Sequence, residues 1–432
     1  MERVILVGIE KKWPVDGTRG AQDDGEGIEE LRRLTETAGG RVTDTLAQRL
    51  TRYNPRSLIG SGKIDEVRRA ARANDAGTII FDENLTPAQQ LHLERELEAK
   101  VVDRTRLILD IFAQRARTKE GELQVELAQL SYMLPRLTGS WRAFSQQAGG
   151  IGTRGPGERK LEYERRHIQR RIAHLKDEIK RMARDRATQR NRRTSIPVPS
   201  VAIIGYTNAG KSSLLNRLTG SSKAGGGPAS VYADDKLFAT LDPTTRRIRL
   251  PAGGWAVFTD TVGFISKLPP QLIAAFRSTL EEVSRADCIL HLEDGASTSI
   301  ERQRKVVDEV LETLDARNIP RVVAVNKKDL LNPDQHLRLR ARNAERLFVS
   351  ALTGDSIEEM LSRVQDMLNK RWILRELTIA PKNAGRLADI YRSAQVIGQT
   401  TRGDRILLRM RVTPENWSRL VAKFKGNSVE KD

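Results

Sequence analysis

Residues 200 to 218 read SVAIIGYTNAGKSSLLNRL, and this stretch decides the fold of the central part of the chain. It opens with an apolar run, Val201 to Ile204, which is typical of a buried strand, and it closes with a helix-forming run, Ser213 to Leu218. Between the two runs lies a loop with the spacing GxxxxGKS. Its glycines let backbone N–H groups wrap phosphates at the positive end of the following helix. The stretch therefore predicts a phosphate-binding α/β domain.

The loop offers groups for both phosphate and metal. Lys211 would neutralise the β- and γ-phosphates of a nucleotide, and the Ser212 hydroxyl would bind Mg²⁺. The predicted phosphate-binding residues are Gly205, Tyr206, Thr207, Asn208, Ala209, Gly210, Lys211 and Ser212.

A second strand end carries matching chemistry. The run from Trp255 to Asp260 ends in an acid that can hold the metal through a water, and Gly263 can offer its N–H to a γ-phosphate. The predicted residues of this motif are Asp260, Thr261, Val262 and Gly263. Phe264 follows at a position where many nucleotide-hydrolysing switch proteins place a glutamine that orients the attacking water. A phenyl ring cannot do this, so we expect a low intrinsic rate of hydrolysis.

The residues that follow a third predicted strand indicate which nucleotide base the site binds. The run from Arg321 to Asn326 leads into NKKD, and the Asp329 carboxylate would pair with the N1–H and amine of guanine, donors that adenine lacks. The predicted residues here are Asn326, Lys327, Lys328 and Asp329, with Ser350, Ala351 and Leu352 closing over the base. Together the motifs predict an enzyme that binds GTP and GDP and hydrolyses GTP, with no catalytic side chain assigned.

Between the first two motifs lies a candidate switch segment. Thr240 is the favoured ligand that would meet Mg²⁺ only in the GTP state, and Thr244 is the alternative. The predicted nucleotide-binding residues of the segment are Phe238, Ala239, Thr240, Leu241 and Asp242.

Charge points to a second partner. The 432 residues carry a net charge of +18, and residues 141–195 alone hold 16 Lys and Arg against 6 Asp and Glu, a net of +10. Concentrated positive charge releases counterions when it meets phosphates, so we expect RNA contact, the alternative being a solvated helix surface.

The single cysteine, Cys288, excludes an internal disulfide, and no apolar run is long enough for a membrane span. A cytoplasmic location follows as an expectation.

The remaining sequence predicts the other domains. Residues 1–110 alternate strands and helices as a small parallel α/β subdomain, with Thr86 capping a helix that starts at Pro87. Residues 111–195 are predicted to form a basic antiparallel helical hairpin, because two seams with 4, 3, 4, 3 spacing, Leu123 to Leu137 and Ile168 to Met182, flank a glycine-rich loop from Gly139 to Gly157. The GTPase domain spans 200–366, and 367–432 form a small α+β domain. The predicted fold class is thus α/β.

The motifs together resemble the HflX GTPases. The resemblance rests on Gly205 to Ser212, FATLDPTTR (Phe238 to Arg246), DTVGF, NKKD and the glycine loop from Gly149 to Gly157, and it covers essentially the whole chain. It implies a protein that binds the large ribosomal subunit and its RNA through the hairpin loop and splits ribosomes under stress. Arg159 departs from the family, which usually has Thr there, so details of the loop contacts are open.

Three alternatives stay open at this point. GTP could time the assembly of the large subunit instead of driving splitting. Asn208 matches a position that coordinates K⁺ in similar GTPases, or it only stabilises the loop. Leu58 to Lys63 resembles a fragment of a phosphate loop, but the full spacing is missing, so a plain strand-to-helix turn is favoured over ATP binding.

Overall fold

The computed structural model resolves the chain into two compact units. It describes residues 1–11, 25–145, 156–193, 198–220, 237–238, 241–267, 272, 277–342, 346–379, 387–402, 405–424 and 430–431. One unit comprises residues 1–181 with the segments 234–241 and 267–276, and the other comprises the rest of the chain. The four domain ranges expected from the sequence stay a prediction.

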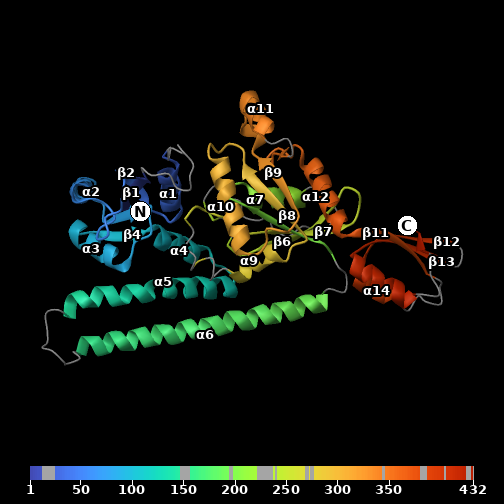
Figure 1. The fold of residues 1–432 in the computed structure, drawn as a ribbon, viewed down its shortest axis with the longest axis horizontal. Coiled ribbons are helices and arrows are strands. Elements are labelled where there is room, and N and C mark those ends of the chain that lie inside the picture. The colour runs from blue at the N-terminus through green and yellow to red at the C-terminus, as the bar shows by residue number, and fades with distance from the viewer. Residues whose placement is uncertain are drawn as a thin grey trace. The chain divides into compact units, whose positions relative to one another are not determined.

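The first unit contains a parallel four-stranded sheet in the order β2-β1-β3-β4 (Figure 1). Its strands are β1 (Arg3–Lys11), β2 (Arg41–Leu50), β3 (Thr78–Phe81) and β4 (Lys100–Asp103). The helices between and after them are α1 (Glu26–Thr37), α2 (Ser61–Ala73), α3 (Pro87–Leu97) and α4 (Arg104–Arg115). Thr86 caps α3 as predicted. Its hydroxyl oxygen accepts a hydrogen bond from the Gln89 backbone amide, and the Gln89 side-chain oxygen accepts one from the Thr86 backbone amide.

Two helix starts in this unit are set by local residues. Strand β4 ends at Asp103, whose carboxylate accepts a hydrogen bond from the Arg106 amide and so starts α4. The turn at Gly60 and Ser61 opens α2 directly, and Lys63 lies inside its first turn, paired with Glu66. Lys63 therefore belongs to an ordinary strand-to-helix turn.

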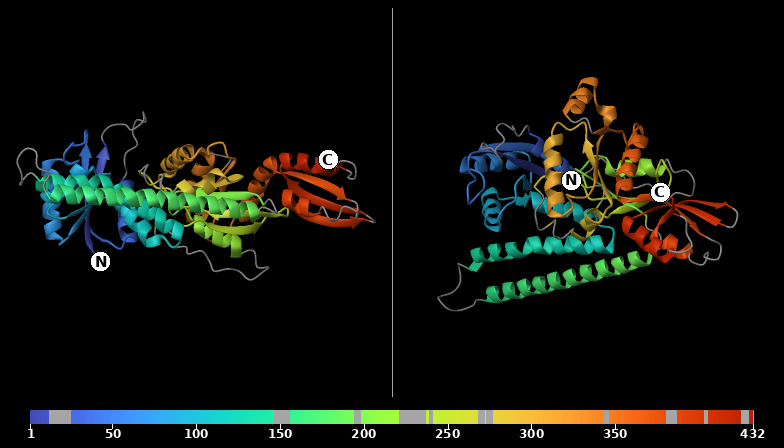
Figure 2. Two further views of the ribbon diagram at one scale, coloured as in Figure 1. Left: turned by 90° about the horizontal axis from the view of Figure 1, so that it is seen from below. Right: turned by 45° about the vertical axis from the view of Figure 1, so that its right-hand side comes forward.

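The two seams lie on long helices that run side by side in opposite directions (Figure 2). These are α5 (Lys119–Ser145) and α6 (Pro156–Arg193), which extend into the predicted loop from both sides. Pro156 suits the first position of α6, where a missing N–H costs nothing. Leu123 and Leu175 of the seams are buried, and Arg171 of α6 makes two hydrogen bonds to Glu126 of α5, at 2.7 and 2.8 Å. Residues 146–155 of the predicted loop lie outside the described residues.

The second unit is built on a six-stranded sheet in the order β10-β9-β8-β5-β7-β6. All neighbours are parallel except β6 and β7. The strands are β5 (Ser200–Gly205), β6 (Thr244–Arg249), β7 (Trp255–Asp260), β8 (Cys288–Asp294), β9 (Arg321–Asn326) and β10 (Leu347–Phe348). The helices are α7 (Lys211–Gly220), α9 (Arg277–Ser284), α10 (Ile300–Thr313), α11 (Pro333–Arg342) and α12 (Ile357–Arg371), with the short 3-10 helix η1 (Lys328–Leu330).

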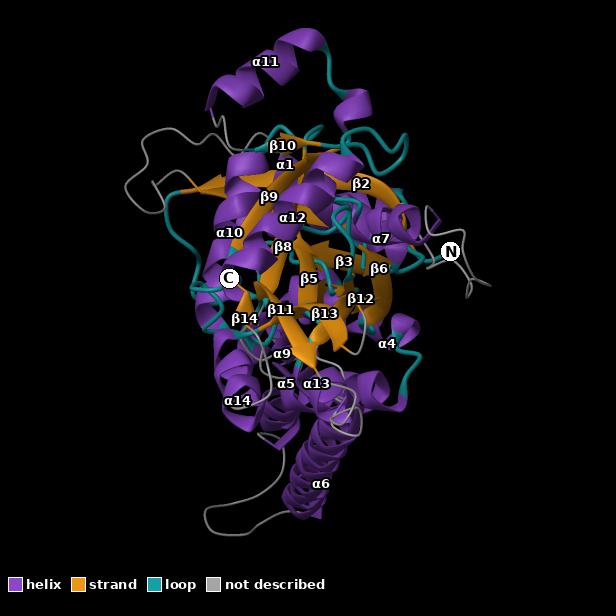
Figure 3. Ribbon diagram, turned by 90° about the vertical axis from the view of Figure 1, so that its right-hand side faces the viewer, coloured by secondary structure: helices purple, strands orange, loops and turns teal. Residues whose placement is uncertain are grey.

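Helices α7, α10 and α12 lie around this sheet (Figure 3). Its strands are apolar because both faces are covered, and its core gathers residues such as Ile203, Phe258 and Leu290. The carboxyl ends of β5, β7 and β9 lie at one edge, which is where this class of sheet binds ligands. The three strand-end motifs of the sequence are therefore brought to a common edge.

A small antiparallel sheet follows, in the order β12-β13-β11-β14. Its elements are β11 (Ile373–Ile379), α13 (Leu387–Ser393), β12 (Gln395–Arg402), β13 (Arg405–Val412), α14 (Pro414–Phe424) and β14 (Glu430–Lys431). The predicted α+β character of this region is confirmed. Among the described helices of the whole chain, none is long and apolar enough to cross a membrane.

Candidate nucleotide site

The phosphate loop sits between β5 and the start of α7. Gly210 has φ +88°, and a Cβ there would come 2.2 Å from Nδ2 of Asn326, so both backbone conformation and space require glycine. Asn208 has φ +62°, a left-handed conformation that asparagine tolerates better than most residues. The loop thus has the tight path that its glycine spacing predicts.

Lys211 is buried beneath this loop. Its Nζ donates to the carbonyl oxygens of Tyr206, at 2.9 Å, and of Gly205, at 3.2 Å. Burial lowers the pKa of Lys211 to about 8, although Asp260 acts in the opposite direction. A buried cation held by backbone carbonyls is a ready partner for an anionic phosphate.

Ser212 and Asp260 come together at the neighbouring strand end. The Ser212 hydroxyl donates to Oδ2 of Asp260 at 2.6 Å, and Asp260 is fully buried at the end of β7. Hydroxyl and carboxylate oxygens are the donors that Mg²⁺ prefers, with substrate phosphates completing its shell. The residues present therefore fit the expected metal.

The segment after Asp260 is tied to the phosphate loop. The Thr207 amide donates to the Phe264 carbonyl at 2.7 Å, and the Phe264 amide donates to the Gly205 carbonyl at 3.1 Å. A Cβ on Gly263 would lie 2.8 Å from Cγ2 of Thr207, so only glycine fits there. The Thr261 hydroxyl donates to the Ile203 carbonyl, whereas Phe264 turns its ring into the core.

The NKKD motif connects two loops of the site. Nδ2 of Asn326 donates to the Ala209 carbonyl at 2.8 Å, and its Oδ1 accepts from the Ala351 amide at 2.9 Å. The Ser350 hydroxyl donates to Oδ1 of the exposed Asp329 at 2.5 Å. The structure thus brings the motif and the 350–352 loop together, and the exposed Asp329 is open to a ligand.

Sequence reasoning missed three supporting side chains. Asp294 at the end of β8 pairs with Lys327 at 2.7 Å, and Asp355 pairs with Lys328 at 2.6 Å. Arg217 of α7 donates to the carbonyls of Ala351 and the exposed Leu352. Asp294 had a usable signal, since it ends the apolar run CILHLED as Asp260 ends β7.

The switch segment is only partly described. Ala239 and the favoured threonine, Thr240, lie outside the described residues. Thr244 is the first residue of β6 and pairs in register with Asp260. Phe238 is buried against Phe112 of α4, with ring centroids 4.6 Å apart, and Leu241 is also buried. The choice between Thr240 and Thr244, and a nucleotide contact by Phe238, Leu241 or Asp242, stay predictions.

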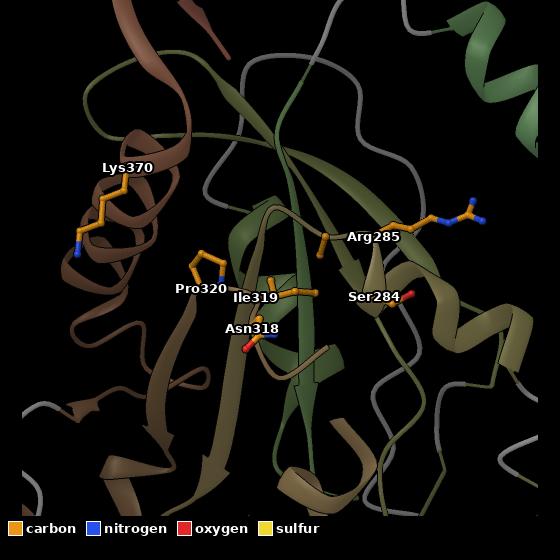
Figure 4. A pocket seen from close by; sticks show the side chains of 7 residues that line it. Ser284, Arg285, Asn318, Ile319, Pro320 and Lys370 are labelled. Atoms are coloured by element: carbon orange, nitrogen blue, oxygen red, sulfur yellow. The ribbon is translucent and has the colours of Figure 1, made fainter. Parts of the chain in front are cut away.

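A pocket of about 510 Å³ lies elsewhere, before the amino ends of β8 and β9. It is lined by Ser284, Arg285, Ala286, Asn318, Ile319, Pro320 and Lys370. In Figure 4 the side chains of Arg285 and Lys370 extend in opposite directions, so they do not converge on one ligand. Because the nucleotide motifs lie at the carboxyl ends of the strands, the pocket at the amino ends is separate from the nucleotide site.

Comparison with known proteins agrees with these motifs. Three family models match: GTP-binding GTPase N-terminal over residues 25–113, GTP-binding GTPase Middle Region over 115–193, and 50S ribosome-binding GTPase over 200–327. A GTPase HflX of Lacrimispora saccharolytica is 42% identical, covering 97% of this chain and 95% of the relative. A GTPase HflX of Escherichia coli is 39% identical and covers 92% of each chain.

One solved structure is also similar along much of the chain. It is a GTP-binding protein from the hyperthermophilic archaeon Sulfolobus solfataricus in complex with GDP. The identity is 23% and the TM-score is 0.43, over 86% of this chain and 99% of that chain.

Proposed function

Since this chain belongs to the HflX family of GTPases and is a GTP-hydrolysing enzyme, we propose that its GTP state binds the large ribosomal subunit and splits or rescues ribosomes under stress. The basic α5–α6 hairpin makes the contact with ribosomal RNA. Hydrolysis of GTP then releases the protein. The observation that carries this proposal is that the same chain holds the strand-end nucleotide motifs and one long basic helix.

The residues of the site divide the work on the nucleotide. Lys211 neutralises phosphate charge, and Asp329 with the 350–352 loop selects guanine over adenine. Asn326 holds the phosphate loop and the base loop at a fixed separation, since one side chain bonds to both. Mg²⁺ would be held by Ser212 and Asp260, with Thr240 joining in the GTP state, and would neutralise charge on the β- and γ-phosphates.

A slow intrinsic rate follows from Phe264. Its ring is buried and offers no hydrogen-bonding group, so the chain has no glutamine-like side chain there to orient water. The large subunit would supply a group that orients the attacking water, or would position the site's own groups to do so. The protein therefore stays in its GTP state until it binds that partner.

The hairpin is the proposed RNA-binding element. Residues 141–195 carry a net charge of +10, and many of the α6 side chains from 165 to 181 are exposed cations. The name of the family model matched by residues 200–327, 50S ribosome-binding GTPase, supports the same partner. Binding should weaken steeply with salt, because each phosphate contact releases a counterion.

Deletion of the hairpin tip tests this assignment. A variant in which residues 142–157 are replaced by a short Gly-Ser linker should no longer co-sediment with large subunits. Its GTP affinity should be unchanged, because the nucleotide site lies in the 200–352 region. Undiminished co-sedimentation of this variant would sink the assignment.

Assembly of the large subunit is the alternative function. It uses the same nucleotide site and the same basic hairpin, so the separating observation is splitting itself. Light scattering by intact ribosomes should fall when the protein and GTP are added. Constant scattering, with binding to large subunits intact, would favour the assembly role.

Potassium is a further candidate cofactor. The left-handed φ of Asn208 gives it a role in shaping the loop, and a K⁺ contact through its side chain would be additional. Turnover in KCl and NaCl at equal ionic strength distinguishes the two roles. A K⁺ site predicts faster turnover in KCl, whereas loop shaping alone predicts equal rates.

A further inference from the structure

Helix α6 has an outward face that is distinct from its seam. Ile168, Ile172, Leu175 and Ile179 form the seam, of which Leu175 is fully buried. At 100° per residue, Tyr163 lies about 150° around the helix from that seam. It is therefore on the side that faces away from α5.

Tyr163 is unusual in its exposure. Its side chain is 70% exposed, and every other described Phe, Tyr and Trp side chain is buried or half-buried. Tyrosine is a weaker helix former than the Arg, Lys and Glu that surround it, so helix stability does not account for it. An exposed ring also contributes no burial to the hairpin.

Arginines follow Tyr163 along the same face of the helix. Arg166, Arg170 and Arg181 fall on the same face by helical spacing, with Asp177 as the acid between them. Arg166 pairs with Glu162 at 2.5 Å, whereas within the described part of the chain no ion pair is recorded for Arg170 or Arg181. The outward face of α6 thus combines one open aromatic ring with arginines available to phosphates.

Resting on the proposed RNA-binding function of the hairpin, we propose that Tyr163 stacks on an unpaired nucleobase while the arginines further along the same face hold the phosphates of the strand. Aromatic rings with cations are the usual platform for single-stranded nucleic acid, because every base has a face on which to stack. Bases in an RNA duplex are already stacked on each other, so a duplex would use the arginines alone. The preferred ligand of this face is therefore a single-stranded RNA loop or bulge.

The test uses the full-length protein and two variants, Tyr163→Ala and Tyr163→Phe. The probes are a fluorescent single-stranded RNA of mixed sequence, the same RNA in a duplex, and purified large subunits. Tyr163→Ala should weaken single-strand binding about 10-fold, within the range for loss of one stacked base, and leave duplex binding unchanged. Tyr163→Phe, which keeps the ring, should bind like the original protein.

Salt dependence separates stacking from charge. For Tyr163→Ala the slope of log affinity against log salt should stay the same, whereas Arg170→Ala should reduce it by about 1. Unchanged single-strand affinity in Tyr163→Ala would overturn the stacking role. A loss confined to large subunits, with RNA affinity intact, would overturn it in favour of a protein contact. If the unaltered protein fails to bind large subunits at all, the proposed function itself fails, whatever Tyr163 does.

Discussion

Nζ of Lys267 lies 2.6 Å from Oδ2 of Asp82, although 185 residues separate them in the chain. Glu83 is also within 3.0 Å of the ammonium group, and Asp82 in turn accepts from the buried Arg104. Lys267 is separated from the DTVGF motif by two residues, and its ammonium group is held at the end of β3 within the first unit. The Leu237 amide likewise donates to the hydroxyl of Thr37, at 3.3 Å. Leu237 and Lys267 thus both belong to the first compact unit, although both lie far in the sequence from residues 1–181, which form most of it.

Removal of this ion pair should destabilise the first unit. Burial alone would lower the pKa of Lys267, but Asp82 and Glu83 outweigh it and raise that pKa. The stabilisation is therefore complete at every pH below the ordinary lysine pKa and is lost only as pH rises through the raised value. Lys267→Ala should lower the free energy of unfolding by about 2 kcal/mol. This is less than the loss on breaking a fully buried ion pair, because Asp82 is still paired with Arg104 in the variant.

Chemical denaturation of the two lysine variants measures this cost. Lys63→Ala is the matched control, because its pair with Glu66 is local and partly exposed and should be worth at most about 0.5 kcal/mol. Equal stabilities for Lys267→Ala and Lys63→Ala would contradict the anchoring role.

Nucleotide binding should take up a proton at Lys211. With its pKa at about 8, much of the free protein has a neutral Lys211 at pH 8.5, and a bound phosphate favours the charged form. Binding of GDP should then take up about 0.8 proton per site at Lys211 at pH 8.5 and close to none there at pH 6.5. Calorimetry in two buffers of different ionisation enthalpy reports this number. A buffer-independent heat at pH 8.5 would mean that Lys211 is already charged in the free protein.

Base specificity should change at Asp329. Asp329→Asn removes the carboxylate that pairs with the guanine donors, so GDP affinity should fall at least about 100-fold. Xanthine carries an oxygen where guanine has its amine, and the new amide can donate to it, so affinity for xanthosine diphosphate should rise. Asp355→Asn is the control, because this exposed acid pairs with Lys328 of the same motif. Retained GDP affinity in Asp329→Asn would remove the base-reading role.

Acid should destabilise the second unit through His291. This side chain is buried in β8, and burial together with nearby arginines lowers its pKa to about 3. The unfolded state therefore binds more protons than the folded state between about pH 6.5 and 3, so stability falls as pH falls through this window. Between pH 7 and pH 5, the free energy of unfolding should fall by about 2 kcal/mol less in His291→Gln than in the original protein.

Urea unfolding at pH 7 and pH 5 measures that difference. His174→Gln, on the exposed side of α6, serves as the control and should follow the original protein. The same loss of stability in all three proteins would show that His291 does not titrate on unfolding.

The elements that depend only on residues close together in the sequence were predictable. The strands that end in Gly205, Asp260 and Asn326 are short apolar runs followed by polar motifs, and the edge they share follows from parallel topology. The helix that begins at Pro87 was equally predictable, because its capping residues, Thr86 and Gln89, lie within four positions of the chain.

Features that depend on distant partners were not predictable. Strand β2 has few apolar residues in alternation and exists through nine residues of parallel pairing with β1. The buried Arg104 and the Lys267–Asp82 pair join residues far apart in the chain, which no spacing rule detects. Helix α4 had a signal in Asp103, whose capping role becomes clear only once β4 is known to end there.

The central claim is that the large ribosomal subunit activates this GTPase. The most direct test is GTP turnover by the purified protein in potassium buffer, with and without large ribosomal subunits. A slow basal rate that rises by about 10-fold or more with subunits is the predicted result, because the buried Phe264 cannot orient water unaided. An unchanged rate would leave the nucleotide site intact and contradict the ribosome as the activating partner.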